Sequence, residues 1–482
     1  MFRRLPTLLA TVLALSLALG AAPSAQARPA SEIAGVAMHP WQVQLPDARE
    51  RIFSGIAATG AKWVRIDLPW SWVEEHGPTV RSGRGAWSQI DAIFGAARQH
   101  GLKPIPIVAY TPNWASPSGE RWAYPDAEPF ETFFTAALRR YPQIQAWELW
   151  NEPNHARFSK PRPDPAAFVE FLRSARRARD SVGSTAKLIS GGIAPGGDID
   201  IDTWINEVAI RGGLNLIDGL GIHPYSSVDP DDPRSWMMQL EGLHQRLAKL
   251  GRPDLPLWLT EYGAPTVAVA NGYAPAMTEQ QQADRLRTAF ALAARFDWIE
   301  NFTWYEYRDG CGDRTEPECN FGLVRADLSH KPAYDALRDV VAGATAQLRA
   351  SLLLSTKIRE ARVPVTAKAS KRSAKPKRSA KPKRHAKKRR AVKRIKVNRI
   401  TVSGRLTLPG TQWPNTRLTV LLPRSGGRTR SVPVVVKEGI FWARFEGRDL
   451  RSGTLQARFA GSAEYQPLTA QIQVTSSVTT IR

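Results

Sequence analysis

Short apolar runs alternate with amphipathic segments along most of the chain, from about residue 34 to residue 345. The apolar runs have the length of buried strands. The segments between them repeat apolar residues every three or four positions, as helices packed on a sheet do. The eight predicted strands are Ala34–Met38, Lys62–Leu68, Pro104–Val108, Gln145–Trp150, Lys187–Ser190, Gly219–His223, Leu257–Glu261 and Asn301–Tyr305. The predicted helices include 48–58, 88–99, 130–140, 165–181, 236–250 and 278–295.

This order of elements predicts an α/β protein whose strands are parallel. Eight βα units in roughly 310 residues fit the size of a (β/α)8 TIM barrel, and right-handed βαβ connections leave few other arrangements. The alternative is a doubly wound open sheet, which normally carries a glycine-rich phosphate loop after its first strand. The sequence has no such loop, so we predict the barrel.

The pattern changes twice beyond the predicted barrel. Residues 346–399 are rich in Lys, Arg, Ala, Ser and Pro, and the hexapeptide Ser-Ala-Lys-Pro-Lys-Arg begins at Ser373 and again at Ser379. This composition predicts a basic disordered linker. Residues 400–482 return to short runs of alternating apolar and polar residues separated by Gly, Pro and Asn. That pattern predicts a small all-β, Ig-like sandwich.

The charge of the chain is unevenly distributed. The formal net charge is +23, and 17 Lys or Arg residues fall between Lys368 and Arg399, where no acidic residue occurs. That segment also has no aromatic residue on which a base could stack, so we expect no specific nucleic-acid partner. Such a segment attracts polyanions, and we expect it to contact an anionic cell-envelope polymer through residues 368–399. The alternative is a soluble spacer.

The N-terminus indicates export. Arg3 and Arg4 precede an apolar run that ends near Ala25-Gln26-Ala27, as in a secretory signal peptide over residues 1–27. An uncleaved N-terminal anchor is the alternative. We therefore expect a secreted protein, extracellular or associated with the cell wall, whose catalytic domain covers residues 28–345. In an oxidising compartment the two cysteines, Cys311 and Cys319, should form a disulfide. Their spacing from the histidines suggests no metal site.

Two glutamates end predicted barrel strands. Glu152 follows the fourth strand and Glu261 closes the seventh. In a barrel the reacting groups lie at the C-terminal ends of the strands, and a carboxylate at the end of an apolar strand needs a partner or a function. For either glutamate alone the alternative is a solvated loop carboxylate. Both together, on strands four and seven, indicate a functional pair.

The segments around these glutamates resemble a known clan. Trp150-Asn151-Glu152-Pro153-Asn154 and Thr260-Glu261-Tyr262-Gly263 are similar to motifs of the retaining (β/α)8 glycoside hydrolases. Residues 112–116, Pro-Asn-Trp-Ala-Ser, are most similar to family 39 glycoside hydrolases and related exopolysaccharide-cleaving enzymes. The resemblance covers residues 34–345. It implies that Glu152 is the general acid/base, that Glu261 is the nucleophile, and that Asn151 contacts the sugar 2-hydroxyl.

Further residues are expected to bind substrate or to tune the glutamates. Period-2 alternation points Arg65 into the barrel, where it would keep Glu261 ionised; an internal ion pair with Asp67 or Glu148 is the alternative. His223 is either a substrate contact or a core histidine, and Tyr225 should hydrogen-bond Glu261. Among the tryptophans near strand ends, Trp114 and Trp304 are the predicted sugar platforms, ahead of Trp70 and Trp122.

The predicted function is that of a secreted retaining glycoside hydrolase that cleaves a polysaccharide or oligosaccharide without a cofactor. The alternative is a non-catalytic polysaccharide-binding wall protein on the same scaffold, but such a protein has no need of paired carboxylates. We expect a monomer.

Overall fold

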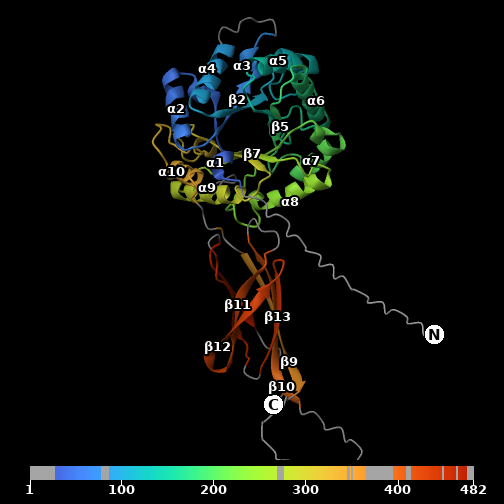
Figure 1. Ribbon diagram of the computed structural model, residues 1–482, viewed down its shortest axis with the longest axis vertical. Helices are drawn as coiled ribbons and strands as arrows, with labels where there is room; N and C mark the ends of the chain where they lie inside the picture. The colour runs from blue at the N-terminus through green and yellow to red at the C-terminus, as the bar shows by residue number, and fades with distance from the viewer. Residues whose placement is uncertain are drawn as a thin grey trace, which may run out of the picture.

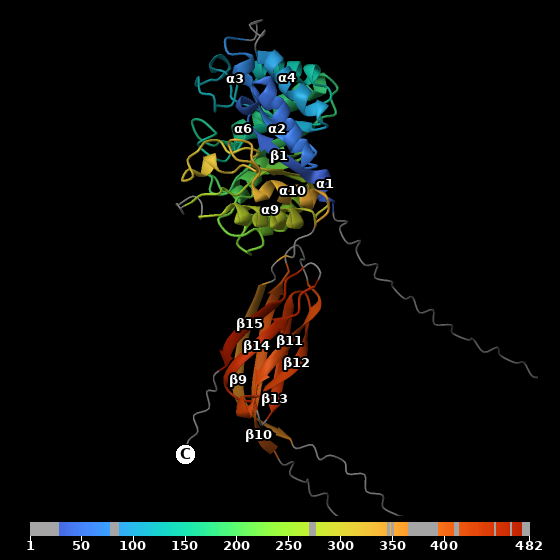
Figure 2. The same ribbon diagram turned by 90° about the vertical axis from the view of Figure 1, so that its left-hand side faces the viewer.

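The computed structural model describes residues 28–77, 86–268, 276–344, 348, 351–364, 394–408, 414–447, 450–462 and 465–474. The predicted signal peptide and most of the basic segment lie outside these residues. Figure 1 and Figure 2 show a barrel of strands ringed by helices, followed by antiparallel sheets. None of the helices in the described part of the chain combines the length and the hydrophobicity that crossing a bilayer requires.

The N-terminal part is the predicted (β/α)8 barrel. Its sheet has the strand order β5-β4-β3-β2-β1-β8-β7-β6, and parallel bridges from Ile189 to Gly219 and from Ile193 to Ile222 join β5 to β6, which closes the ring. The strands are β1 (Ala34–Met38), β2 (Trp63–Pro69), β3 (Lys103–Ala109), β4 (Ala146–Asn151), β5 (Lys187–Gly192), β6 (Leu220–Ile222), β7 (Leu257–Tyr262) and β8 (Ile299–Trp304). All eight predicted strands are confirmed.

Helices follow the strands and cover the outside of the ring (Figure 1). They are α1 (Ala30–Ile33), α2 (Pro46–Ala58), α3 (Trp70–Val73), α4 (Ala86–Gln99), α5 (Ala127–Arg140), α6 (Pro165–Ser181), α7 (Ile201–Ile210), α8 (Trp236–Lys249), α9 (Glu279–Ala293) and α10 (Pro332–Val341). Polar caps begin several of them: the Asp164 carboxylate accepts hydrogen bonds from the first turn of α6, and Thr278 and Gln281 form a capping box on α9.

Side chains fill the interior of the barrel below the site. Trp63, Ile105, Ala146, Ile189 and Trp258 form one buried apolar cluster. Strand β2 explains how polar residues come to lie above it, because Trp63, Arg65 and Asp67 alternate with Val64, Ile66 and Leu68 and so share the inner face. The apolar cluster thus fills the lower part of the barrel interior, and the charged residues of the site lie above it.

The C-terminal part consists of two antiparallel sheets, in agreement with the predicted Ig-like sandwich. Their strand orders are β13-β10-β9 and β12-β11-β14-β15. The strands are β9 (Ser351–Pro364), β10 (Arg394–Thr407), β11 (Thr416–Pro423), β12 (Thr429–Val436), β13 (Ile440–Gly447), β14 (Gly453–Phe459) and β15 (Leu468–Val474). Buried side chains between the sheets include Val402, Val420 and Phe441.

The boundary of the predicted linker needs a correction. Strand β9 and the first residues of β10 fall inside residues 346–399, yet they pair in register from Pro364–Arg394 to Ser351–Thr407. The Leu352-Leu353-Leu354 run lies in this ladder and is a sequence signal for a strand. The basic composition of the surrounding residues led us to predict a linker instead. The β region therefore starts near residue 351. Residues 365–393 lie outside the described part of the chain.

Candidate active site

The C-terminal ends of the barrel strands surround a cavity of about 580 Å³. Both glutamates predicted to be catalytic line it. Its other lining residues are His39, Trp41, Gln42, Arg65, Asp67, Tyr110, Trp122, Asn151, His155, Arg157, Phe158, Ala194, Pro195, Tyr225, Tyr305, Glu306, Gly310, Glu318 and Phe321. A cavity at this end of a barrel is where catalytic residues from different strands can converge.

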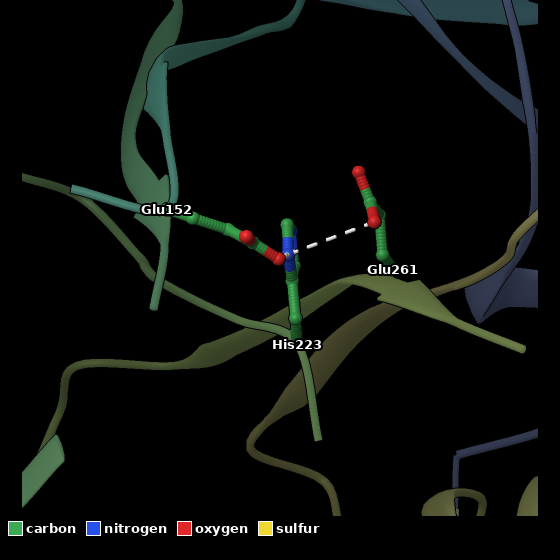
Figure 3. A group of neighbouring side chains, drawn as sticks. All are labelled: Glu152, His223 and Glu261. Atoms are coloured by element: carbon green, nitrogen blue, oxygen red, sulfur yellow. Dashed lines mark hydrogen bonds and ion pairs between the residues drawn. The ribbon is translucent and has the colours of Figure 1, made fainter. Parts of the chain in front are cut away.

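Glu152 and Glu261 point toward each other across His223 (Figure 3). One carboxylate oxygen of each glutamate and a ring nitrogen of His223 all lie within 4.8 Å of one another. The side chains of Glu152 and Glu261 are 16% and 12% exposed, so both reach the cavity without being freely solvated. The structure therefore brings together the two carboxylates that the sequence placed on separate strands.

The backbone around Glu152 is conformationally unusual. Trp150 and Glu152 have φ values of 79° and 39°, which side-chain-bearing residues rarely adopt. Asn154 holds this turn in place: its Nδ2 donates to the Ala194 carbonyl at 2.8 Å, and its Oδ1 accepts from the Ala194 amide at 3.1 Å. The asparagine that follows the Glu-Pro pair thus ties the end of β4 to the end of β5 and aims Glu152 into the cavity.

Arg65 links the nucleophile candidate to the barrel interior. Its Nε donates to Glu148 Oε2 at 2.6 Å, its Nη1 pairs with Glu261, and its Nη2 donates to Asn151 Oδ1 at 3.0 Å. Burial opposes the charge on Arg65, but the carboxylates of Glu148 and Glu261 outweigh it and raise the pKa of Arg65. Arg65 therefore points into the barrel as predicted and contacts Glu261, and its interior partner is Glu148 and not Asp67.

His223 is fully buried beneath Glu152. Its Nδ1 lies 2.9 Å from Glu152 Oε1, and its Nε2 lies 3.2 Å from Thr260 Oγ1. Burial would lower the pKa of His223, but the negative charges of Glu261, Glu148 and Glu152 raise it to about 9. Gly192 makes room for the ring, because a Cβ there would lie 2.1 Å from His223 Nε2.

Glu152 and His223 together determine where a proton lies in the free protein. Burial alone would raise the pKa of Glu152, but the hydrogen bond and the charge of His223 lower it below its ordinary value. Glu148, which is fully buried, also has its pKa lowered to about 2, because the charges of Arg65 and His223 outweigh the effect of burial. The imidazole therefore holds the proton at neutral pH, and Glu152 is its anionic partner.

The predicted hydrogen bond between Tyr225 and Glu261 is present: the Tyr225 hydroxyl donates to Glu261 Oε2 at 3.0 Å. Glu261 thus accepts from Arg65 on one oxygen and from Tyr225 on the other. These contacts fix the position of the carboxylate, as a nucleophile requires.

The two predicted sugar platforms are not in the cavity. Trp304 is 0% exposed and packs edge-to-face on Tyr262 in the core, while the next residue, Tyr305, faces the cavity. Trp114 donates its Nε1 to the Glu74 carbonyl at 2.7 Å and packs on Trp70. The expectation for Trp304 is wrong, and Trp114 does not line the cavity.

Trp41 and Trp122 line the cavity instead. Trp41 is 52% exposed and stacks on the His39 ring, with centroids 4.0 Å apart and an interplanar angle of 8°. The sequence analysis missed Trp41, although it lies three residues after the first predicted strand and so met the strand-end criterion applied to the other tryptophans. Its flat exposed ring is suited to the C–H face of a sugar.

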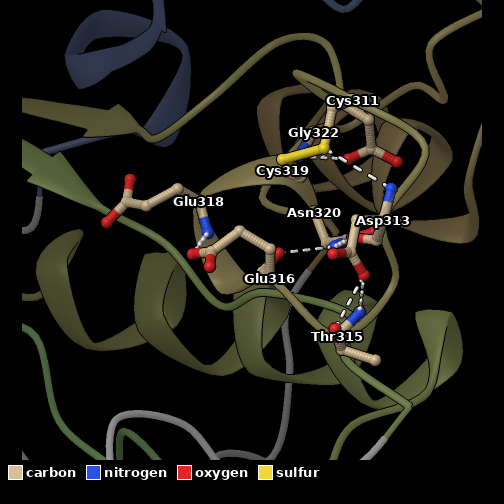
Figure 4. The surroundings of a disulfide bond; sticks show 9 residues. Cys311, Asp313, Thr315, Glu316, Glu318, Cys319, Asn320 and Gly322 are labelled. Carbon is tan, nitrogen blue, oxygen red and sulfur yellow. Dashed lines mark hydrogen bonds between the residues drawn. A yellow bond between two sulfur atoms is a disulfide. The ribbon is translucent and has the colours of Figure 1, made fainter.

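The Cys311–Cys319 disulfide is confirmed and stiffens one rim of the cavity (Figure 4). Asn320 donates from its side-chain amide to the carbonyls of Asp313 and Glu316 at 2.6 and 2.7 Å, which closes the loop from inside. Glu318, within this loop, lines the cavity. The disulfide loop therefore contributes a carboxylate to the site.

Glu152, His223 and Glu261 have the spacing of a metal site, but their chemistry fits a proton better. A metal-bound histidine must be neutral, whereas the surrounding carboxylates stabilise the protonated ring of His223. Arg65 and Tyr225 also occupy the oxygens of Glu261.

A (β/α)8 barrel with paired carboxylates at the ends of β4 and β7 is the arrangement of a glycosidase barrel. Comparison with known families supports this class: residues 128–320 match the family described as glycosyl hydrolase catalytic core. The match, which covers less than half of the chain, supports the resemblance to the (β/α)8 glycoside hydrolase clan that was found in the sequence. The match supports glycoside hydrolysis as the activity and a carbohydrate as the substrate.

Solved structures show the same fold. A family 39 glycoside hydrolase from Bacteroides cellulosilyticus superposes with a TM-score of 0.51 at 20% identity, covering 87% of this chain and 79% of that one. A GH5_18 protein from Streptomyces cattleya gives a TM-score of 0.50 at 20% identity over 64% and 80% of the two chains. A GH5_18 protein from Bifidobacterium longum subsp. infantis gives 0.50 at 18% identity over 66% and 80%. No curated protein sequence matches the chain.

Proposed function

We propose that the chain is a secreted, retaining glycoside hydrolase that acts on a polysaccharide or oligosaccharide by double displacement. The observation that carries this proposal is the separation of at most 4.8 Å between oxygens of Glu152 and Glu261. Retaining enzymes hold their carboxyl groups about 5 to 5.5 Å apart, whereas inverting enzymes separate them by about 6.5 to 9.5 Å to admit a water molecule.

In the first step Glu152 gives a proton to the departing glycosidic oxygen while a Glu261 oxygen attacks the anomeric carbon. The carbon–oxygen bond to the leaving group breaks and a glycosyl ester of Glu261 forms. In the second step Glu152 takes a proton from water, the water oxygen attacks the anomeric carbon, and the ester bond to Glu261 breaks. Arg65 and Tyr225 stabilise the carboxylate that departs.

The proton for the first step resides on His223 in the free protein, so it must reach Glu152 when substrate binds. A bound sugar removes water from Glu152, which favours its neutral form. The 2.9 Å hydrogen bond between His223 Nδ1 and Glu152 Oε1 provides the path. Glu152 and His223 then act as one acid, in which Glu152 touches the substrate and His223 is a positioning residue.

Substitution of each glutamate tests the roles. Glu261→Gln should abolish turnover, because the amide cannot attack. Glu152→Ala should retain turnover of activated aryl glycosides, whose leaving groups need no proton, and added azide should accelerate it and give a glycosyl azide of retained configuration. An inverted product from the unaltered protein, followed by proton NMR, or full activity in either variant would contradict the assignment.

We also propose that residues 368–399 hold the enzyme at an anionic cell-envelope polymer. A chain truncated after Gly343 should keep full turnover of a small glycoside but lose binding to isolated envelopes at low salt, because the excess positive charge has been removed. The full chain should be released at about 0.5 M salt. Equal envelope binding by the two chains would contradict this role.

A further inference from the structure

A second group of polar side chains in the cavity has no task in the double displacement. His39 follows β1, Asp67 lies near the C-terminal end of β2, and Glu306 follows β8. These strands are neighbours in the ring, and β8 stands opposite β4 in the closed order of eight strands. Because Glu152 on β4 protonates the leaving group, the sugar that becomes attached to Glu261 is expected on the side of β8 and β1.

Glu306 is the buried acceptor on that side. It is 2% exposed, and among the described residues Gln42 is the one hydrogen-bond donor to its carboxylate, from Nε2 to Oε2 at 3.3 Å. His39 Nε2 lies 3.7 Å from the same oxygen, beyond hydrogen-bond range, and faces the Tyr305 hydroxyl at 3.1 Å. A buried carboxylate with one neutral donor is incompletely satisfied.

The surroundings compensate this charge only in part, through the imidazole of His39. Burial raises the pKa of Glu306, the carboxylates of Asp309 and Glu318 raise it as well, and His39 and Gln42 lower it, with a net pKa of about 7. Arg65 is engaged by Glu148 and Glu261. The wall therefore carries more carboxylate than cation, which disfavours an acidic sugar and favours a donor with positive charge.

Resting on the proposed function, we propose that the sugar bound between β8 and β1 carries a free amino group, and that the ammonium ion of this amino sugar is bound by the unsatisfied oxygen of Glu306. An ammonium group supplies both the charge and the several donors that the carboxylate lacks. A hydroxyl supplies one neutral donor, and an N-acetyl group removes the charge. The preferred substrate is accordingly a glycan that contains de-N-acetylated amino sugars. Trp41, stacked on His39, provides a flat surface beside this subsite.

Binding of monosaccharides tests the proposal without turnover. Calorimetry or ligand-observed NMR on the full chain should compare glucosamine and galactosamine with glucose, galactose, their N-acetylated amines and the corresponding uronic acids. We expect an amine to bind at least tenfold more tightly than its hydroxyl and N-acetyl counterparts, and the uronic acids to bind most weakly. Because this series uses the unaltered protein, it decides the ligand class whether or not a variant folds.

Two variants then identify the residue responsible. Glu306→Gln should lose the preference for the amine while changing hexose binding less than threefold. Glu75→Gln makes the same chemical change at a carboxylate that is 75% exposed and does not line the cavity, and it should keep the preference. Equal binding of amine and hexose, a preference that survives in Glu306→Gln, or no binding by any amine would overturn the proposal. Absence of hydrolysis of every glycoside would instead count against the proposed function, and would leave the binding result intact.

Discussion

Replacing His223 with Gln should displace the alkaline limb of the pH profile. In the unaltered protein the proton for the leaving group is shared by Glu152 and His223, and the charges around the imidazole raise its pKa to about 9. Activity on substrates with poor leaving groups should therefore persist through neutral pH and fall as the pair loses its proton near pH 9.

In the variant only Glu152 can hold that proton. The ordinary pKa of a glutamate is 4.5, and burial raises the pKa of Glu152 from that value. Above the pKa of an acid, each pH unit removes about tenfold of its protonated form. We therefore expect the alkaline limb to move by about two pH units or more toward acid. At pH 8, about one unit above the displaced limb, kcat/KM should fall by at least about tenfold, which corresponds to about 1.4 kcal/mol in activation free energy.

The assay compares two leaving groups on whichever aryl glycoside the protein hydrolyses. A dinitrophenyl leaving group needs no proton, so its kcat/KM should lose little at pH 8, whereas an unactivated phenyl leaving group should show the full loss. His244→Gln is the matched control, because His244 lies on α8 stacked against Trp298 and outside the cavity. An alkaline limb that stays near pH 9 in His223→Gln, or equal losses for both leaving groups, would refute the proposed sharing of the proton.

Three further changes have defined outcomes. Arg65→Met should lower the free energy of unfolding by about 3 to 5 kcal/mol, because it leaves Glu148 buried without its cation; chemical denaturation measures this, and an unchanged midpoint would contradict the ion pair. Trp41→Ala should raise KM severalfold for an oligosaccharide while leaving kcat nearly constant, and a loss confined to kcat would argue against a sugar platform. Cys311→Ser should reduce stability by about 2 to 3 kcal/mol at most, because the disulfide closes a short loop, and turnover should weaken without being lost.

The barrel and the catalytic pair could be predicted from the sequence because both depend on local patterns. In each βα unit an apolar run typical of a strand is followed by the three-to-four-residue repeat of a helix. Because βαβ connections are right-handed, eight such units are expected to close into a barrel. Glu152 and Glu261 each follow an apolar strand within a recognisable motif, so the barrel topology alone brings them to one end. Arg65 was found for a related reason, since alternation along a strand fixes the face of a residue.

Other features depend on contacts between distant segments, which no local pattern encodes. Trp304 and Tyr305 are adjacent aromatics at the end of β8, and only the packing of Trp304 on Tyr262 decides which of them faces the cavity. Strand β9 is identified by its pairing with β10, which lies well beyond it in the sequence. The basic residues around β9 obscure its strand pattern in the sequence.

The electrostatic properties of the site are likewise tertiary. The imidazole of His223 holds a proton because three carboxylates from β4, β7 and the turn after β4 converge on it. Glu306 is incompletely satisfied because it is buried and, among the described residues, Gln42 is the one donor to its carboxylate. The sequence by itself thus determined that Glu152, Glu261 and Arg65 reach the cavity from the strands. The tertiary structure decided their protonation, because charge interactions depend on distance and burial in three dimensions and not on position along the chain.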